Sequence, residues 1–169
     1  GRHRLAEANA HLDATARSLE RANRAFAGAN RRLNLILQSA SEGICGVDRD
    51  ERITFANPAA CAMTGYGHDE LLGRSLHALL HHTRADGTPS PTIDCPVFEV
   101  LRTGESRAGV DDIYWRKDGS SFPVEFAASP MVEDGRVEGA VVVFHEIAER
   151  KRAEEALRQS KSVAEAASR

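Results

Sequence analysis

The 169-residue sequence has little cysteine, few aromatic residues and no long hydrophobic segment. The cysteines, Cys45, Cys61 and Cys95, are odd in number and lack zinc-finger spacing, which argues against both a disulfide framework and a structural zinc site. No run reaches the roughly 18 apolar residues of a membrane span, and residues 1–4 lack the apolar core of a signal peptide. We therefore expect a cytoplasmic chain with reduced thiols and no membrane-spanning segment.

The net charge of −3 conceals an uneven distribution. Residues 1–40 carry seven arginines against three acidic residues, whereas residues 41–145 carry nine basic residues against seventeen acidic ones. An acidic middle, and arginines spread around a helix, argue against a nucleic-acid surface. The sequence also has no glycine-rich phosphate loop and no nucleophile with an evident base, so we expect no enzymatic activity in this chain.

Large apolar residues recur every seven positions near the N terminus: Leu5, Leu12, Leu19, Phe26 and Leu33. This heptad predicts a coiled-coil helix over residues 1–38. If these are d positions, Asn23 and Asn30 occupy a positions, where asparagine favours a parallel two-stranded coil. In the other register, Ile36 and four small residues lie opposite the leucines. Because a lone helix cannot bury such a stripe, we predict a parallel homodimer; the alternative is a helix folded back on its own domain.

After residue 40 the hydrophobic period changes from about 3.5 to about 2. Two short strand-like runs flank the polar residues 48–51, and Asn57-Pro58 then starts the first of several short helices. Three more strands are predicted at residues 108–116, 121–128 and 137–144, because Asp-Gly turns separate them. This order predicts an α+β fold: a five-stranded antiparallel sheet with short helices on one side, preceded by a long coiled-coil helix and followed by a C-terminal helix.

Six short segments in this order resemble the PAS domain family: residues 48–52, 55–60, 64–66, 70–74, 116–119 and 146–151. The resemblance covers residues 39–150 and gives a PAS domain over 39–147 with a signalling helix over 148–169. The last segment departs from the common Asp-Ile-Thr pattern, with Glu146 for Asp and Ala148 for Thr. The usual hydroxyl bond at the junction of strand and helix is therefore missing.

The resemblance implies a sensory and dimerisation module of a signal-transduction protein. Residues 160–169 resemble the stretch before the phosphoacceptor helix of sensor histidine kinases, so we expect a kinase domain to follow in cis. Glu146, Ile147 and Arg150 are the residues predicted to transmit the signal. His145 begins a short likeness to the phosphoacceptor box, but it ends a strand, and we do not expect it to be phosphorylated. The alternative function is a ligand-free dimerisation spacer.

The resemblance also bears on cofactors. Flavin photochemistry of the light-oxygen-voltage type needs a cysteine where this sequence has Leu76, so that chemistry is not expected. Haem-binding relatives place an axial ligand in the region that here contains His81, His82 and Cys95, which makes haem, or a metal shared by these three, the alternative to a cofactor-free domain. Cys95 is also a candidate redox-sensitive thiol. Equally, the histidines could face solvent while Cys95 fills a small space at a helix start.

Overall fold

The computed structural model describes all 169 residues, which form two compact units, Gly1–Ser39 and Ala40–Arg169. The first unit is a single helix, α1 (Arg2–Ser39), in which no residue is buried. Its heptad leucines and Phe26 are all more than half exposed. None of the helices in the chain combines the length and the hydrophobicity that a membrane crossing requires.

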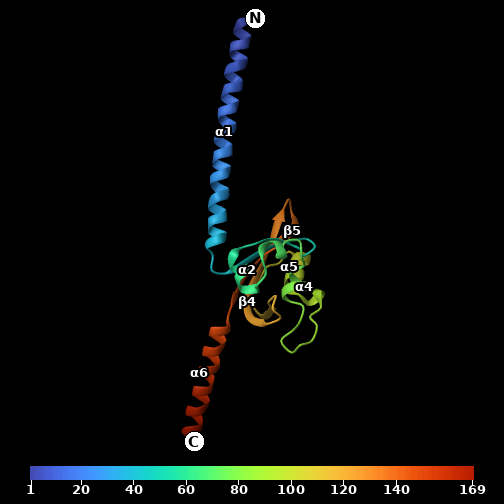
Figure 1. Ribbon diagram of the computed structural model, residues 1–169, viewed down its shortest axis with the longest axis vertical. Coiled ribbons are helices and arrows are strands. Elements are labelled where there is room, and N and C mark those ends of the chain that lie inside the picture. Colours follow the sequence, from blue (N-terminus) through green and yellow to red (C-terminus); the bar gives the residue numbers. More distant parts are fainter. The chain divides into compact units, whose positions relative to one another are not determined.

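The second unit is an α+β domain with a helix at its C-terminal end (Figure 1). Its elements are β1 (Gly43–Asp48), β2 (Ile53–Ala56), α2 (Pro58–Thr64), α3 (His68–Leu71), α4 (Leu76–Leu80), the 3-10 helix η1 (Thr92–Asp94), α5 (Pro96–Thr103), β3 (Arg107–Trp115), β4 (Ser121–Glu133), β5 (Arg136–Glu146) and α6 (Ala148–Ala167). All strand pairs are antiparallel, in the order β2-β1-β5-β4-β3. The predicted five-stranded antiparallel sheet, with a long helix before it and a helix after it, is confirmed.

Local sequence explains where α2 begins and ends. The Asn57 side chain accepts a hydrogen bond from the backbone N–H of Ala60, and Pro58 occupies the first helical turn. Gly65 ends the helix in the left-handed conformation, with φ of 75°, which costs a glycine little. Asn57 also accepts from the backbone N–H of Ile44 at 2.8 Å, so the same side chain attaches the helix to β1.

The hydrophobic core lies between one face of the sheet and the short helices. Along β4, buried residues alternate with half-exposed ones, as expected for a strand with only one covered face. Helices α2, α4 and α5 contact the sheet. An aromatic layer fills the covered face of the three C-terminal strands: Tyr114, Phe122, Phe126 and Phe144.

Strands β4 and β5 are longer than the sequence predicted. β4 continues past residue 128 to Glu133, and Pro130 lies within it, opposite Ala140 of β5. Strand β3 pairs with β4 only as far as residue 128, so Pro130 lies where β4 has no neighbour on that side. A proline is tolerated there because the missing N–H breaks no ladder bond.

Candidate functional site

Two histidines and a cysteine meet in the buried interior of the sheet domain. His77 lies on α4, His81 caps the C-terminal end of that helix, and Cys95 caps the N-terminal end of α5. All three residues are buried, and their potential ligand atoms all lie within 4.8 Å of one another. The four-residue spacing of the histidines explains half of this arrangement, because residues i and i+4 lie on the same side of a helix.

Both imidazole rings are held from their outer side by an oxygen acceptor. His77 Nε2 lies 2.7 Å from the backbone oxygen of Ser90, and His81 Nε2 lies 2.7 Å from Oδ2 of Asp112 on β3. A proton on each Nε2 satisfies these contacts, so Nδ1 is the nitrogen that carries the lone pair when a ring is neutral. The Nδ1 atom of His77 is buried without a hydrogen-bond partner, as is the hydroxyl of Tyr114, whose ring lies 5.9 Å from that of His81.

A buried carboxylate supports the start of α4. Glu51 accepts hydrogen bonds from the hydroxyl of Ser75 and from the backbone N–H of His77. Burial raises the pKa of Glu51, and the bonds from Ser75 and His77 counteract part of that shift. Because Glu51 lies in the turn between β1 and β2, these bonds fix the first histidine relative to the sheet.

The cluster lowers the pKa of its cysteine. Burial alone would raise the pKa of Cys95, but the neighbouring rings of His77 and His81 outweigh burial and bring the pKa down to about 7. By contrast, burial and the nearby Cys61 raise the pKa of Cys45 to about 12. Cys95 is therefore the thiol in this chain that is ionised in a large share of molecules near neutral pH.

The pKa of His81 shifts in the opposite direction to that of Cys95. Burial opposes a charged ring, yet the bond to Asp112 and the proximity of Cys95 prevail and raise the pKa of His81 to about 9. The cluster thus holds an imidazolium between a thiolate and a carboxylate. Cys95, His81 and Asp112 are arranged in the order of a nucleophile, a base and an orienting acid. However, Cys95 is only 1% exposed, so a substrate has no access to its sulfur.

The junction between β5 and α6 is fixed by three residues that contact the rest of the sheet domain. Glu146 pairs with Arg116 at 3.2 Å, and the backbone N–H of Ile147 donates to the oxygen of Pro123 at 3.0 Å. The Ile147 side chain is buried. Arg150, in the first turn of α6, pairs with Glu125 at 2.9 Å and with Asp111 at 3.3 Å. The three residues predicted to transmit a signal therefore all contact the sheet.

Arg150 bridges two acidic residues that face each other across the sheet. Asp111 on β3 and Glu125 on β4 are direct cross-strand partners, and both lie on the face opposite the core. Like charges in directly opposite positions repel, so a cation between them stabilises the strand pair. The Arg150 guanidinium occupies that position and lowers the pKa of Glu125 through its hydrogen bond.

Comparison with known families decides what kind of domain this is. A family model described as the PAS fold matches residues 31–147, more than half of the chain. The chain belongs to the PAS family. The PAS domain is a sensory and non-catalytic unit, and this one is related to the PAS regions of sensor histidine kinases.

Relatives and solved structures agree with this assignment. The chain is 29% identical over 130 residues to the probable diguanylate cyclase DgcE of Escherichia coli K12, and 25% identical over 131 residues to the signal transduction histidine-protein kinase AtoS of the same organism. The alignments cover 75% and 78% of this chain but only 11% and 20% of those proteins. The crystal structure of the PAS domain of an HTR-like protein from Haloarcula marismortui superposes with a TM-score of 0.59 at 24% identity, covering 76% of this chain and 99% of that one.

Within the PAS domain, the structure brings together two of the three ligand residues that the sequence nominated. His81 and Cys95 belong to the buried cluster, but His82 does not. Its ring is exposed and stacks on Trp115, with centroids 5.5 Å apart. Helix α4 ends at Leu80 with His81 as its C-terminal cap, and His82 already belongs to the loop that follows, where its side chain faces outward.

Sequence reasoning missed His77 and Asp112. The spacing from His77 to His81 was a usable signal, because a pair of histidines four residues apart presents both rings on one face of a helix. Asp112 had no comparable signal in the sequence. It reaches His81 only because β3 lies beside α4 in the folded PAS domain.

Proposed function

We propose that this chain is a sensory module that passes a change in the PAS core to a downstream histidine kinase through α6, and that it works as a parallel homodimer held by α1. The kinase is proposed because AtoS, which resembles this chain, is a signal transduction histidine-protein kinase. The chain spans between a tenth and a fifth of the length of the curated relatives described above. The kinase as output domain is therefore part of the proposal.

A pair of consecutive aspartates on β3 carries the proposal. Asp112 faces the core and contacts His81 at 2.7 Å, whereas Asp111 faces the opposite side and contacts Arg150 of α6 at 3.3 Å. Consecutive residues of a strand point to opposite faces, so one short segment of backbone joins the buried cluster to the exit helix. A change that moves the His81 ring displaces Asp112, and with it the anchor of α6.

The relay then acts on a two-state element, the first turn of α6. The docked and undocked arrangements of this turn are in equilibrium. A signal can shift that equilibrium only by the free-energy difference with which it favours one arrangement over the other. Ile147 and the backbone bond to Pro123 hold the junction in place. Arg150 is the contact that a shift of β3 would strengthen or break.

We expect Arg150→Ala to loosen the first turn of α6. The substitution removes both ion pairs with the sheet and leaves Asp111 and Glu125 to repel each other. Amide hydrogen exchange at residues 148–152 should become several-fold faster, while exchange in the interior of β5 should not change. Arg158→Ala is the matched control, because Arg158 pairs only with Glu155 in its own helix. Equal exchange in the two variants would contradict the proposed anchor.

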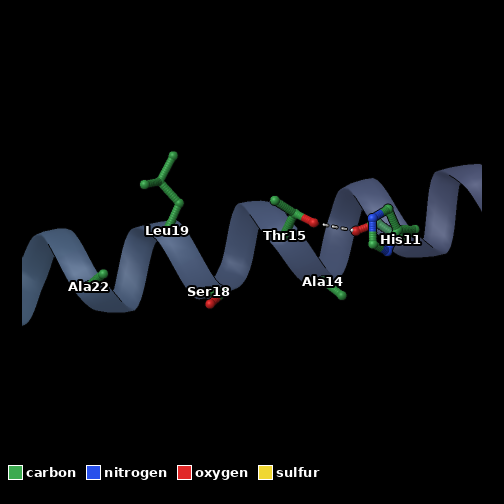
Figure 2. A pocket seen from close by; sticks show the side chains of 6 residues that line it. All are labelled: His11, Ala14, Thr15, Ser18, Leu19 and Ala22. Carbon is green, nitrogen blue, oxygen red and sulfur yellow. Dashed lines mark hydrogen bonds between the residues drawn. The ribbon is translucent and has the colours of Figure 1, made fainter.

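The dimer rests on the exposed stripe of α1. Figure 2 shows the Leu19 side chain projecting from the helix, while the Thr15 hydroxyl donates to the backbone oxygen of His11 at 2.9 Å. Small residues such as Ala22 leave a shallow hollow beside Leu19, of the kind that accepts a side chain from a second helix. Leu19 is 60% exposed in the single chain, and a second copy of α1 would cover it.

The register of this dimer can be tested with a double substitution, Asn23→Leu with Asn30→Leu. If both asparagines occupy a positions, leucine should raise the melting temperature of the coiled coil while loosening the choice of dimer over higher oligomers. In the other register the asparagines flank the seam, and both quantities should change little. Thermal unfolding by circular dichroism and light scattering separate these results. A monomer in both the original and substituted chains would contradict the dimer.

The competing function is a PAS spacer that joins the two helices without sensing anything. It predicts that α6 exchanges equally fast whether or not the buried cluster is altered. Comparing α6 exchange between the original chain and Asp112→Asn therefore separates the sensor from the spacer, since this substitution changes the His81 contact and leaves Arg150 in place.

A further inference from the structure

The buried cluster has the features of a metal site and not only of a hydrogen-bonded network. It presents two imidazoles and one thiolate, a donor set that suits zinc and other thiophilic ions. The Nδ1 atom of His77 is buried with no hydrogen-bond partner. A buried polar atom without a partner costs free energy, and an ion placed between the three side chains would supply that partner.

The surroundings of the rings match those of known metal-binding histidines. A histidine that binds a metal through one nitrogen usually donates its other N–H to a carboxylate or to a backbone oxygen. His81 does so to Asp112, and His77 does so to the backbone oxygen of Ser90. Both contacts use Nε2, so both rings have Nδ1 available for a ligand.

Distance and charge also fit a single dication. One potential ligand atom from each of the three residues lies within 4.8 Å of the other two, whereas tetrahedral zinc bonds imply separations of about 3.4–3.6 Å. Side-chain movements of about 1 Å therefore complete the site. A dication would displace the extra proton of His81 on binding, and the Cys95 thiolate and the Asp112 carboxylate would then balance its charge.

We propose that His77, His81 and Cys95 bind one Zn²⁺ ion, through Nδ1 of each histidine and the sulfur of the cysteine, with Asp112 and the Ser90 backbone oxygen as the outer partners. The site leaves a fourth position on the metal for a water molecule or a small ligand. The buried hydroxyl of Tyr114, which also lacks a partner, belongs to a ring beside His81. The metal site shares His81 and Asp112 with the proposed relay, but it does not depend on any contact of α6.

A single ion agrees with the packing better than a haem does. The rings of Tyr114, Phe126 and Phe144 fill the sheet face beside the cluster, with neighbouring centroids 5.2–5.7 Å apart, and none is more than 2% exposed. A porphyrin would have to displace these rings from the core, whereas an ion needs only the small contraction described above.

Cobalt is the spectroscopic probe for this site. The purified chain, stripped with a chelator, should bind one Co²⁺ per chain and show a thiolate-to-metal charge-transfer band, which added Zn²⁺ abolishes. Cys95→Ser should lose that band, and His77→Gln should weaken binding by more than about 100-fold, because loss of an outer partner alone costs about 10–100-fold. Asp112→Asn should fall within that 10–100-fold range. His82→Gln and Cys61→Ser are the matched controls and should bind as the original chain does.

The site would be overturned if the original chain bound neither Co²⁺ nor Zn²⁺, or bound cobalt without the charge-transfer band. Equal cobalt affinity in Cys95→Ser and Cys61→Ser would also contradict it. So would stoichiometric iron with a Soret band in the protein as purified. Circular dichroism establishes that each variant is folded. Should Cys95→Ser unfold, the comparison of His77→Gln with His82→Gln decides the matter. Because these measurements use neither α6 nor a kinase, the metal site can fail while the proposed relay holds, and the reverse.

Discussion

Replacing Phe144 with alanine is expected to lower the free energy of unfolding of the PAS domain by about 3–5 kcal/mol. Phe144 has no exposed surface and lies on β5, the middle strand of the sheet. Its ring packs at 5.2 Å from that of Tyr114 in an edge-on geometry. Losing the ring removes buried apolar area and leaves a cavity that a rigid sheet cannot close. Urea unfolding followed by the fluorescence of Trp115, the only tryptophan, measures the change.

Phe26→Ala is the matched control, because the same atoms are lost from a side chain that is 70% exposed on α1. It should shift the unfolding reported by Trp115 by less than about 0.5 kcal/mol. Gly43 offers a sharper test, since it is paired with Phe144 and a Cβ built there would lie 2.5 Å from the ring. Gly43→Ala should destabilise the original chain but cost little or nothing in the Phe144→Ala background. A loss below about 1 kcal/mol for Phe144→Ala would mean that the aromatic layer does not support the core.

The parts of the fold that sequence predicts are those specified by local interactions. Asn57, Pro58 and Gly65 set the limits of α2 through a cap, a fixed φ and a left-handed residue, and each acts within a few residues of the chain. The Asp-Gly turn at Gly119 works in the same way, with a φ of 84°. Strand ends are less local. The extension of β4 through Pro130 depends on where β3 stops, which no short window of sequence contains.

The candidate site shows the same division. The proximity of His77 and His81 follows from helix periodicity, whereas His82, two residues beyond the end of α4, does not share that face. Cys95 could be nominated for its chemistry, but its low pKa arises from two histidines on another helix. Asp112 and Ser90 complete the surroundings from a strand and a loop that only the folded chain brings together. Chemistry was predictable here from residue types, and geometry from spacing only within a single helix.

The dimer proposed for α1 should dissociate when charged side chains are placed in its apolar stripe. Leu12→Lys combined with Leu19→Lys is expected to convert the proposed dimer to a monomer. Each buried leucine contributes about 1.5–3 kcal/mol, and the pair of substitutions removes four of them per dimer, so the association constant should fall by at least about 10⁴-fold. Four lysines placed in one seam would also repel each other. Sedimentation equilibrium over a range of protein concentrations measures this change.

Leu35→Lys is the control for that experiment. Leu35 is as exposed as Leu12 and Leu19, yet it lies outside the a and d positions in both possible registers of the heptad. Leu35→Lys should leave the mass of the assembly and the helical signal of α1 unchanged. The Leu12 and Leu19 double variant should lose part of that helical signal, because an isolated polar helix depends on a partner for its stability. A helix that folds back on its own domain predicts instead that the original chain is already a monomer. Dissociation by Leu35→Lys to the same extent would show that hydrophobicity alone, and not the seven-residue repeat, holds the two chains together.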